Sequence, residues 1–113
     1  MKTAAQDITR YADMFAALGA EPRLRIVRLL LAAHPDGMVV NEIQAETGVA
    51  GSTLSHHLDK LKHDALVTAE REKAFIRYRA NIGALEELLG FLYAECCTRN
   101  KAVEPKRIAA LCK

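Results

Sequence analysis

The sequence predicts a mainly α-helical fold that carries one small β-hairpin. Apolar side chains recur at helical spacing in most segments between the turns, which keeps them on one helix face. Only two short runs, residues 66–72 and 74–80, alternate between apolar and polar residues as strands do. The length of 113 residues fits a single domain, which we place at residues 1–100, followed by a tail at 101–113.

Two helices are predicted at the start of the chain. Residues 6–18 form one apolar stripe, and residues 22–33 form a second, in which Pro22 suits the first turn of a helix. The segment 34–37, "HPDG", is a turn by its Pro and Gly content. The stripes consist of Ile8, Tyr11, Met14, Phe15 and Leu18 in the first helix, and of Leu24, Val27, Leu30 and Leu31 in the second.

Two further helices follow that turn, joined by a short connection. Residues 40–48 predict a short helix with Asn41 as its N-cap and Gly48 as its stop. Residues 52–66 predict a longer helix, which we expect Ser52 to cap. Its narrow apolar stripe consists of Leu54, Leu58 and Leu61. A short helix, a tight turn and a longer helix together have the layout of a helix-turn-helix.

The chain continues with the hairpin, a last helix and a polar tail. The two alternating runs meet near Lys73. Residues 83–97 predict a helix with one apolar face, and the tail 98–113 is polar apart from a weak apolar patch at Ile108 and Leu111. The apolar face of the last helix consists of Leu85, Leu88, Leu89, Leu92 and Tyr93.

The longer helix of the predicted helix-turn-helix carries side chains that suit DNA recognition. Small polar groups in its first two turns can approach base edges and phosphates in a major groove, and its N-terminus adds free N–H groups. Lys60 and Lys62 add positive charge along the same helix. We therefore expect double-stranded operator DNA as the partner. The candidate DNA-binding residues are Ser52, Thr53, Ser55, His56, His57, Lys60, Lys73 and Arg77.

Positive charge in the hairpin supports this interpretation. The net charge is only +2, so DNA contact depends on local clustering of Lys and Arg. The hairpin supplies such a strip, suited to phosphates, which consists of Arg71, Lys73, Arg77 and Arg79. Ser and Thr at a helix start are also common as caps, and a protein-interaction module without DNA contact is the alternative. The combination of the helical pair with a basic hairpin favours DNA.

Two segments carry a resemblance to a known family. "LGAEPRLRIVRLL" (18–30) followed by "STLSHHLDKLKHDALV" (52–67) resembles the ArsR/SmtB family of bacterial metal-sensing repressors, over roughly residues 8–98. The resemblance implies a winged helix-turn-helix fold and a homodimer built mainly from the first and last helices. It also implies a repressor that binds a two-fold operator until an inducer arrives.

The sequence departs from that family's pattern at three places. Asp64 and Ala65 stand where the family usually has Ala and Gly, so the residue that most easily adopts a left-handed conformation is missing at the helix end. The helix 40–48 has no cysteine, and residues 83–95 have no histidine, so two inducer sites of the family are absent. The cysteines near the C-terminus are the remaining candidate.

The inducer is expected at the adjacent Cys96 and Cys97, with Cys112 as a third ligand from the same or the partner chain. Thiolates prefer soft ions, and the shortage of nearby His and carboxylate groups disfavours zinc. We therefore expect As(III) or Sb(III) as the inducer and no organic cofactor. Other soft ions (Cd, Pb, Hg or Zn), a thiol redox switch and cysteines that only fill space are the alternatives.

Other classes of function have little support in the sequence. It shows no paired carboxylates, phosphate-binding loop or nucleophile and base at catalytic spacing, so we do not expect an enzyme. It has no apolar run long enough to span a membrane and no signal-peptide core, which makes the cytoplasm the default expectation.

Overall fold

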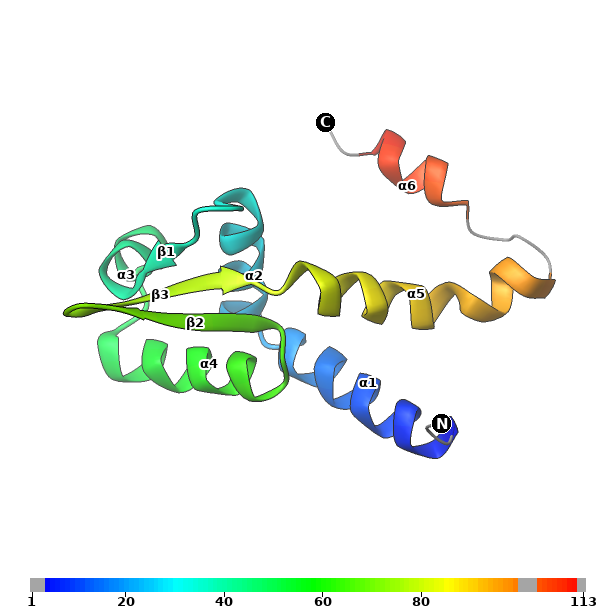
Figure 1. Cartoon of the computed structure of the whole chain (residues 1–113), viewed down its shortest axis with the longest axis horizontal. Helices are drawn as coiled ribbons and strands as arrows, with labels where there is room; N and C mark the ends of the chain where they lie inside the picture. The colour runs from blue at the N-terminus through cyan, green and yellow to red at the C-terminus, as the bar shows by residue number, and fades with distance from the viewer. Residues whose placement is uncertain (1–3, 100–103, 112–113) are drawn as a thin grey trace.

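The computed structural model of the chain confirms a mainly helical fold with a small sheet (Figure 1). It describes the backbone of residues 4–99 and 104–111, and the side chains of residues 8–94, 104 and 106–111. The helices are α1 (Ala4–Leu18), α2 (Glu21–Ala32), α3 (Val40–Thr47), α4 (Gly51–His63), α5 (Ile82–Arg99) and α6 (Pro105–Ala110), and the strands are β1 (Met38–Val39), β2 (Val67–Glu72) and β3 (Phe75–Ala80). The order of helices and hairpin matches the sequence prediction, which missed β1 and α6.

The sheet has three antiparallel strands in the order β1-β3-β2. β2 and β3 form the predicted hairpin, in which Val67 pairs with Ala80 and Glu72 with Phe75. β1 adds a two-residue strand at the other edge of β3, where Met38 pairs with Tyr78. Such a short strand carries no periodic signal of its own, because its position depends on pairing with β3, far along the chain.

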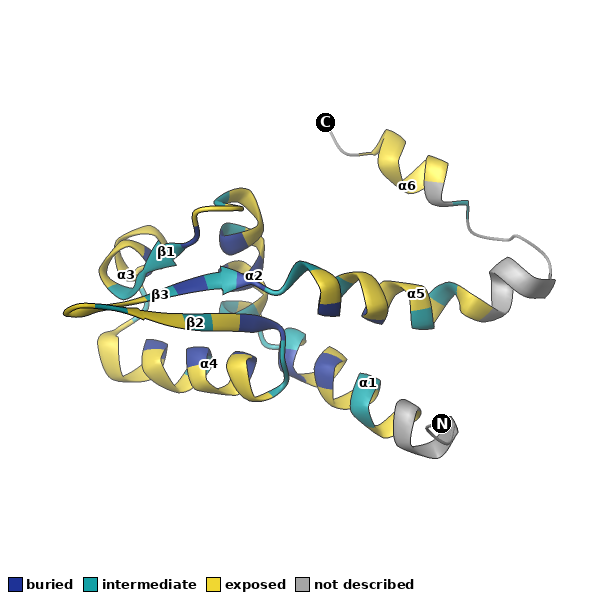
Figure 2. Ribbon diagram, viewed as in Figure 1, coloured by how far each residue is buried: buried dark blue, intermediate teal, exposed yellow. Residues whose placement is uncertain are grey.

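The core lies between the helix-turn-helix and the sheet. Leu54, Leu58 and Leu61 of α4 are fully buried, which confirms the predicted stripe. They face inward, while the opposite side of α4 is exposed (Figure 2). Because burial of a leucine side chain stabilises the fold by roughly 1.5–3 kcal/mol, this stripe fixes α4 firmly on the domain.

The buried face of α2 agrees only in part with the prediction, which is confirmed for Val27 and Leu30 and wrong for Leu24 and Leu31. Ile26, Val27 and Leu30 are buried, whereas Leu24 is 47% exposed and Leu31 is 42% exposed. Ile26 and Leu30 are four residues apart and so lie on the same side of the helix. The face that contacts the core is therefore rotated away from Leu24 and Leu31, which remain at the surface.

The starts of α3 and α4 also differ from the predictions. The residue that precedes α3 is Val39, not Asn41, and its N–H donates to the Glu42 carboxylate at 3.0 Å. The residue that precedes α4 is Ala50, and no side chain caps this helix, so Ser52 lies within the first turn rather than at the cap. The predicted stop at Gly48 is confirmed, because this residue adopts a left-handed conformation with φ of 71°.

The end of α4 has the left-handed geometry that the sequence disfavours. Ala65 has φ of +63°. The N–H of Leu66 donates to the carbonyl of Leu61 at 2.9 Å, and the N–H of Ala65 donates to that of Lys62 at 3.0 Å. These two bonds form a Schellman motif, a helix end that usually has glycine at its left-handed position. The chain thus leaves α4 toward β2 in this geometry even with alanine at that position.

Candidate nucleic-acid interface

The outer face of α4 is a polar, accessible surface. Its first two turns expose four of the predicted residues, namely Ser52, Thr53, Ser55 and His56. The three buried leucines occupy the opposite side of the helix, and Figure 2 shows the outer side of α4 coloured as exposed. The helix is therefore a rigid support for hydroxyl and imidazole groups that can form hydrogen bonds with a ligand outside the protein.

His57 is the one predicted residue of this group that is half-buried. Its Nδ1 lies 3.3 Å from a terminal guanidinium nitrogen of Arg23, in the first turn of α2. The pKa of His57 is lowered, first by burial, then by the positive charge of Arg23, and then by His56. The neutral form of the ring is therefore favoured at this position.

The lysines of α4 differ in how much free charge they offer. Lys60 forms an ion pair with Asp64, one turn further along, with 3.2 Å between the amine and the carboxylate oxygen. Lys62 is exposed. Part of the charge of Lys60 is thus balanced within the helix, a pairing that the i to i+4 spacing allows.

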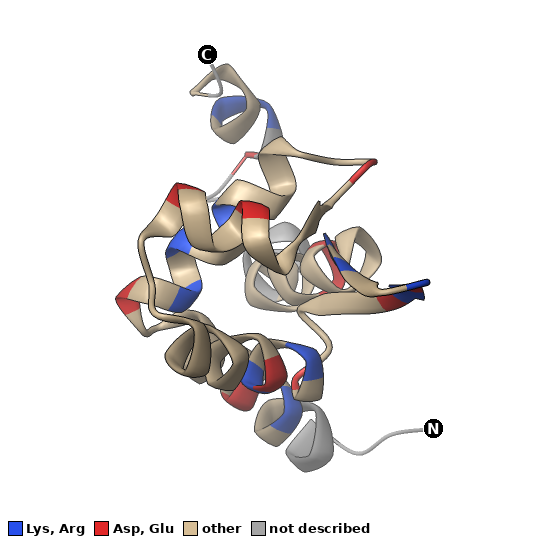
Figure 3. Cartoon of the chain, turned by 90° about the vertical axis from the view of Figure 1, so that its left-hand side faces the viewer, with Lys and Arg blue, Asp and Glu red and all other residues tan. Residues whose placement is uncertain are grey.

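The basic strip of the hairpin is partly neutralised by carboxylates. Arg77 pairs with Glu72 at 3.0 Å, and Arg79 pairs with Glu70 at 2.6 Å. These pairs could not be predicted from the sequence, because they depend on the strand register. Arg71 and Lys73 are exposed near the turn of the hairpin, where Figure 3 shows Lys and Arg close to acidic residues.

The same arginines also fasten the hairpin to the segment before β1. Arg79 donates from Nε to the carbonyl of Pro35 at 3.1 Å, and Arg77 donates to the carbonyl of Asp36 at 3.4 Å. Both side chains therefore hold the β2–β3 hairpin, which forms the wing, in place. The more accessible charge for a phosphate lies at Lys73, a predicted DNA-binding residue, and at Arg71, which was predicted only as part of the basic strip.

A second surface feature is an apolar groove, formed by α1, the end of α2 and α5. Its volume is about 280 Å³. Phe15 is 38% exposed and Leu89 is 49% exposed, so large apolar groups face the solvent there. α1 and α5 also contact each other, since the rings of Tyr11 and Phe91 stack with 4.3 Å between their centroids. The groove is lined by Phe15, Leu18, Leu31, Ile82, Leu85, Glu86, Leu88 and Leu89.

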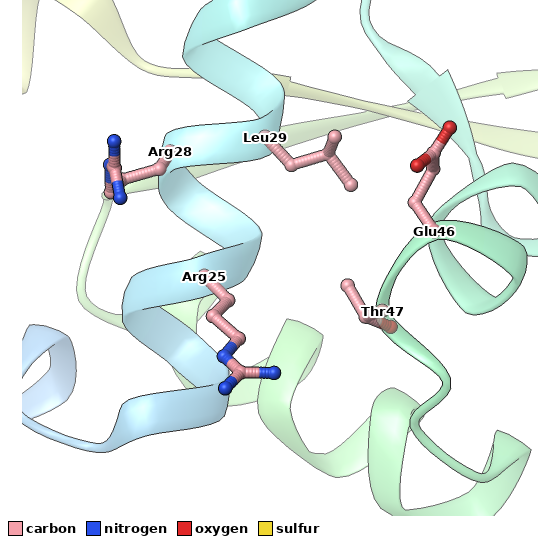
Figure 4. Close-up of a pocket in the computed structure, with 5 residues that line it drawn as sticks. All are labelled: Arg25, Arg28, Leu29, Glu46 and Thr47. Atoms are coloured by element: carbon pink, nitrogen blue, oxygen red, sulfur yellow. The ribbon is translucent and has the colours of Figure 1, made fainter.

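A further hollow of about 330 Å³ lies between α2 and α3 and has a mixed lining (Figure 4). Leu29 points toward α3, whereas Arg28 points away from Glu46. Arg25, at its lower end, is paired with Glu21 at 2.7 Å. The polar groups of the hollow therefore do not converge on one point, as they do in most sites for small ligands.

The predicted thiol site falls mostly outside the described part of the chain. Cys96 and Cys97 belong to the last turns of α5, but their side chains are not among those described, and Cys112 lies outside the described residues. Among the side chains that are described, no three His, Cys, Asp or Glu groups lie close enough to hold a metal ion. No helix in the described ranges 4–99 and 104–111 has the length and apolar content needed to cross a bilayer.

Comparisons with known proteins agree with this architecture. A family model described as a helix-turn-helix domain matches residues 15–70. The transcriptional regulator HlyU from Vibrio vulnificus CMCP6 is 30% identical, with a TM-score of 0.58, and the match covers 79% of this chain and 93% of that one. A possible transcriptional regulator for arsenical resistance is 26% identical, with a TM-score of 0.64 and coverage of 87% and 94%.

A third solved structure shares the fold at lower identity. It is the homodimeric winged helix-turn-helix DNA-binding domain of a possible ArsR-family transcriptional regulator from Mycobacterium bovis. It is 24% identical, with a TM-score of 0.65, and the match covers 92% of this chain and 95% of that one. No curated protein matches the sequence significantly.

The exposed polar face of α4, the hairpin beside it and these matches define the class of the protein. The chain belongs to the winged helix-turn-helix transcriptional regulators.

Proposed function

We propose that the chain is a homodimeric, ArsR-type repressor that binds operator DNA and leaves it when a thiophilic ion binds Cys96 and Cys97. The observation that carries the DNA-binding part is the outer face of α4. Ser52, Thr53 and Ser55 are exposed there on a helix whose other side is fixed by buried leucines. A helix held in this way can enter a major groove and present its side chains to base edges.

The apolar groove supports the dimer. A second copy placed there would cover Phe15, Leu31 and Leu89, which the single chain leaves exposed. α1 and α5 project together from one side of the helix-turn-helix, so a pair of such chains would carry its two α4 helices at opposite ends (Figure 1). For successive major grooves these helices must be about 34 Å apart. The related domain from M. bovis is itself homodimeric.

The position of the cysteines supports the proposed inducer site. Cys96 and Cys97 lie on α5, whose preceding turns line the apolar groove. An ion that draws these thiolates together would change the end of α5, and with it the separation of the two α4 helices. As(III) and Sb(III) suit such ligands, because soft ions prefer thiolates. The similarity to a possible regulator for arsenical resistance points the same way.

The proposal can be tested with reduced protein in a gel-shift titration. The probe is a duplex that the wild-type protein selects from a randomised pool. Arsenite should weaken binding by roughly 5- to 150-fold, the usual range of coupling between two sites. The double variant C96S/C97S should bind the same duplex and no longer respond. If it still releases the DNA at saturating arsenite, these thiols are not the inducer site.

A second measurement decides the role of Cys112. Thiol titration before and after addition of arsenite should show the loss of three thiols per ion if Cys112 is a ligand. The variant C112S should then lose two thiols and bind arsenite more weakly. An identical affinity in the two proteins would remove Cys112 from the site.

A redox switch on the same thiols is the rival function. It predicts that peroxide or polysulfide, and not arsenite, releases the DNA, with a mass change that matches a cysteine crosslink or oxidation. The same gel-shift assay separates the two, because arsenite acts on fully reduced protein.

A further inference from the structure

Arg23 joins three elements of the domain. It stands in the first turn of α2, and its Nε donates to the carbonyl of Ala17, near the end of α1, at 2.6 Å. A terminal nitrogen of the same guanidinium lies 3.3 Å from Nδ1 of His57 on α4. Both partners thus receive hydrogen bonds from one planar group, whose N–H donors have fixed directions. The orientation of the His57 ring is therefore set from behind by α1 and α2.

The chemistry of the pair fixes the position of the ring proton. A guanidinium remains charged at any working pH and has only donors, so it can share a hydrogen bond only with an atom that accepts. Nδ1 of His57 must therefore carry a lone pair. Burial and the two neighbouring groups that can carry positive charge, Arg23 and His56, oppose a charged ring. In the neutral ring that results, the hydrogen is on Nε2.

Nε2 forms no hydrogen bond within the described part of the chain. Within the described part of the structure, the only hydrogen bond of the His57 ring is the one at Nδ1. His57 is half-buried and lies one helical turn after Thr53, whose side chain is on the exposed face of α4. An N–H group with a fixed direction is thus placed at the edge of the surface that we propose for DNA.

We propose that His57 contacts DNA as a neutral hydrogen-bond donor through Nε2–H, and that Arg23 is the positioning residue that fixes this tautomer. The inference rests on the proposed DNA-binding function. The partner atom is a hydrogen-bond acceptor of the duplex, either a purine N7, a guanine O6 or a thymine O4 in the major groove, or a phosphate oxygen. A fixed donor rejects base edges that present a donor, so a base contact here would contribute to sequence preference.

The first test needs no DNA. Long-range proton–nitrogen NMR spectra of the free protein distinguish the two neutral tautomers and the charged ring. At pH 7.5 the wild-type protein should show His57 with its proton on Nε2. The variant R23M should lose this preference, while R23K, which keeps a charged donor, should retain part of it. A proton on Nδ1 in the wild type, or an unchanged tautomer in folded R23M, would overturn the proposal.

The second test uses a matched pair of substitutions at His57. The amide nitrogen of glutamine lies close to the position of Nε2, whereas the amide oxygen of asparagine lies close to that of Nδ1. H57Q therefore keeps a donor for DNA, and H57N keeps an acceptor for Arg23. On the duplex selected by the wild-type protein, H57N should bind about tenfold more weakly, and H57Q should bind within a few-fold of wild type. Equal losses in the two variants would overturn the proposal.

Modified duplexes identify the acceptor. Replacement of single purines by 7-deazapurines removes one N7 at a time, and neutral methylphosphonate linkages remove one phosphate charge at a time. The modification that weakens wild-type binding but not H57N binding marks the contact. If the wild-type protein selects no duplex at all, the proposed function fails, and this inference fails with it. If the wild type binds and no modification distinguishes it from H57N, only the inference fails.

Discussion

The side-chain amide of Asn81 donates a hydrogen bond to the carbonyl of Ala65 at 2.8 Å, which ties the start of α5 to the exit of α4. The backbone N–H of Asn81 reinforces this link by donating to the carbonyl of Leu66 at 3.0 Å. The other end of the amide caps α5, since its oxygen accepts from the N–H of Ala84 at 3.3 Å. A movement of α5 would therefore be transmitted through these hydrogen bonds to the end of α4, the helix that we expect to contact DNA.

Substitutions of Asn81 should separate the cap from the link to α4. N81D keeps an oxygen for the N–H of Ala84 but loses the donor to Ala65, and N81A loses both. We expect N81D to lower the free energy of unfolding by about 1 kcal/mol and N81A by about 2 kcal/mol, because each removes a hydrogen-bond partner of a part-buried group. Denaturant unfolding measures both values. Equal stability of N81D and wild type would show that the bond to Ala65 contributes nothing.

Much of the fold could be predicted because it depends on local pattern. The spacing of Leu54, Leu58 and Leu61 is sufficient to orient α4, and Gly48 ends α3 by its own conformational preference. β1 could not be predicted in this way, since two residues become a strand only by pairing with β3. In α2 the prediction was wrong for Leu24 and Leu31, because in sequence these surface leucines look the same as those that contact the core.

The candidate site was only partly accessible from the sequence. Residue type and helical position correctly indicated that Ser55 and His56 are exposed on α4, whereas His57, predicted with them, is half-buried. The sequence did not show that Arg77 is paired with Glu72, or that Arg23 is bonded to His57, because both contacts arise from tertiary packing. The DNA-binding and inducer roles of the predicted residues stay predictions.

Ala65 offers a simple way to stabilise the domain. Its φ of +63° places an L-residue with a Cβ in the left-handed region, which costs about 1 kcal/mol relative to glycine. A65G should therefore raise the free energy of unfolding by about 0.5–1 kcal/mol. The control is A32G in the last turn of α2, where glycine should lower stability by a similar amount. A less stable A65G protein would contradict this account of the helix end.

The pKa of His57 predicts that stability falls in mildly acidic solution. The folded state holds this pKa below its ordinary value of 6.5, so on acidification the unfolded chain takes up a proton first. Stability is therefore full above that value and decreases as the pH falls through it. H57N keeps an acceptor for Arg23 and does not titrate. Unfolding at pH 7.5 and 5.5 should show a larger loss for wild type than for H57N, and an equal loss would exclude His57 as the source.

The arginines of the wing should fall into two groups. R71Q removes an exposed charge, so it should weaken DNA binding and reduce the slope of log affinity against log salt by about one. R77Q instead breaks the pair with Glu72, so it should lower stability by up to about 1 kcal/mol and leave the salt slope nearly unchanged. Anisotropy titrations at several salt concentrations measure the slopes. A full unit lost in R77Q alone would reverse the assignment.

The apolar groove predicts how the dimer can be broken. L89D places a carboxylate on a surface that we expect a second copy to cover, and a buried unpaired charge is strongly unfavourable. Light scattering after size-exclusion chromatography should therefore find a dimer for wild type and a folded monomer for L89D. Phe75, which is 54% exposed on the wing, provides the matched control, because F75D adds the same charge away from the groove. If L89D remains a dimer, or if F75D also becomes a monomer, the groove is not the dimer interface.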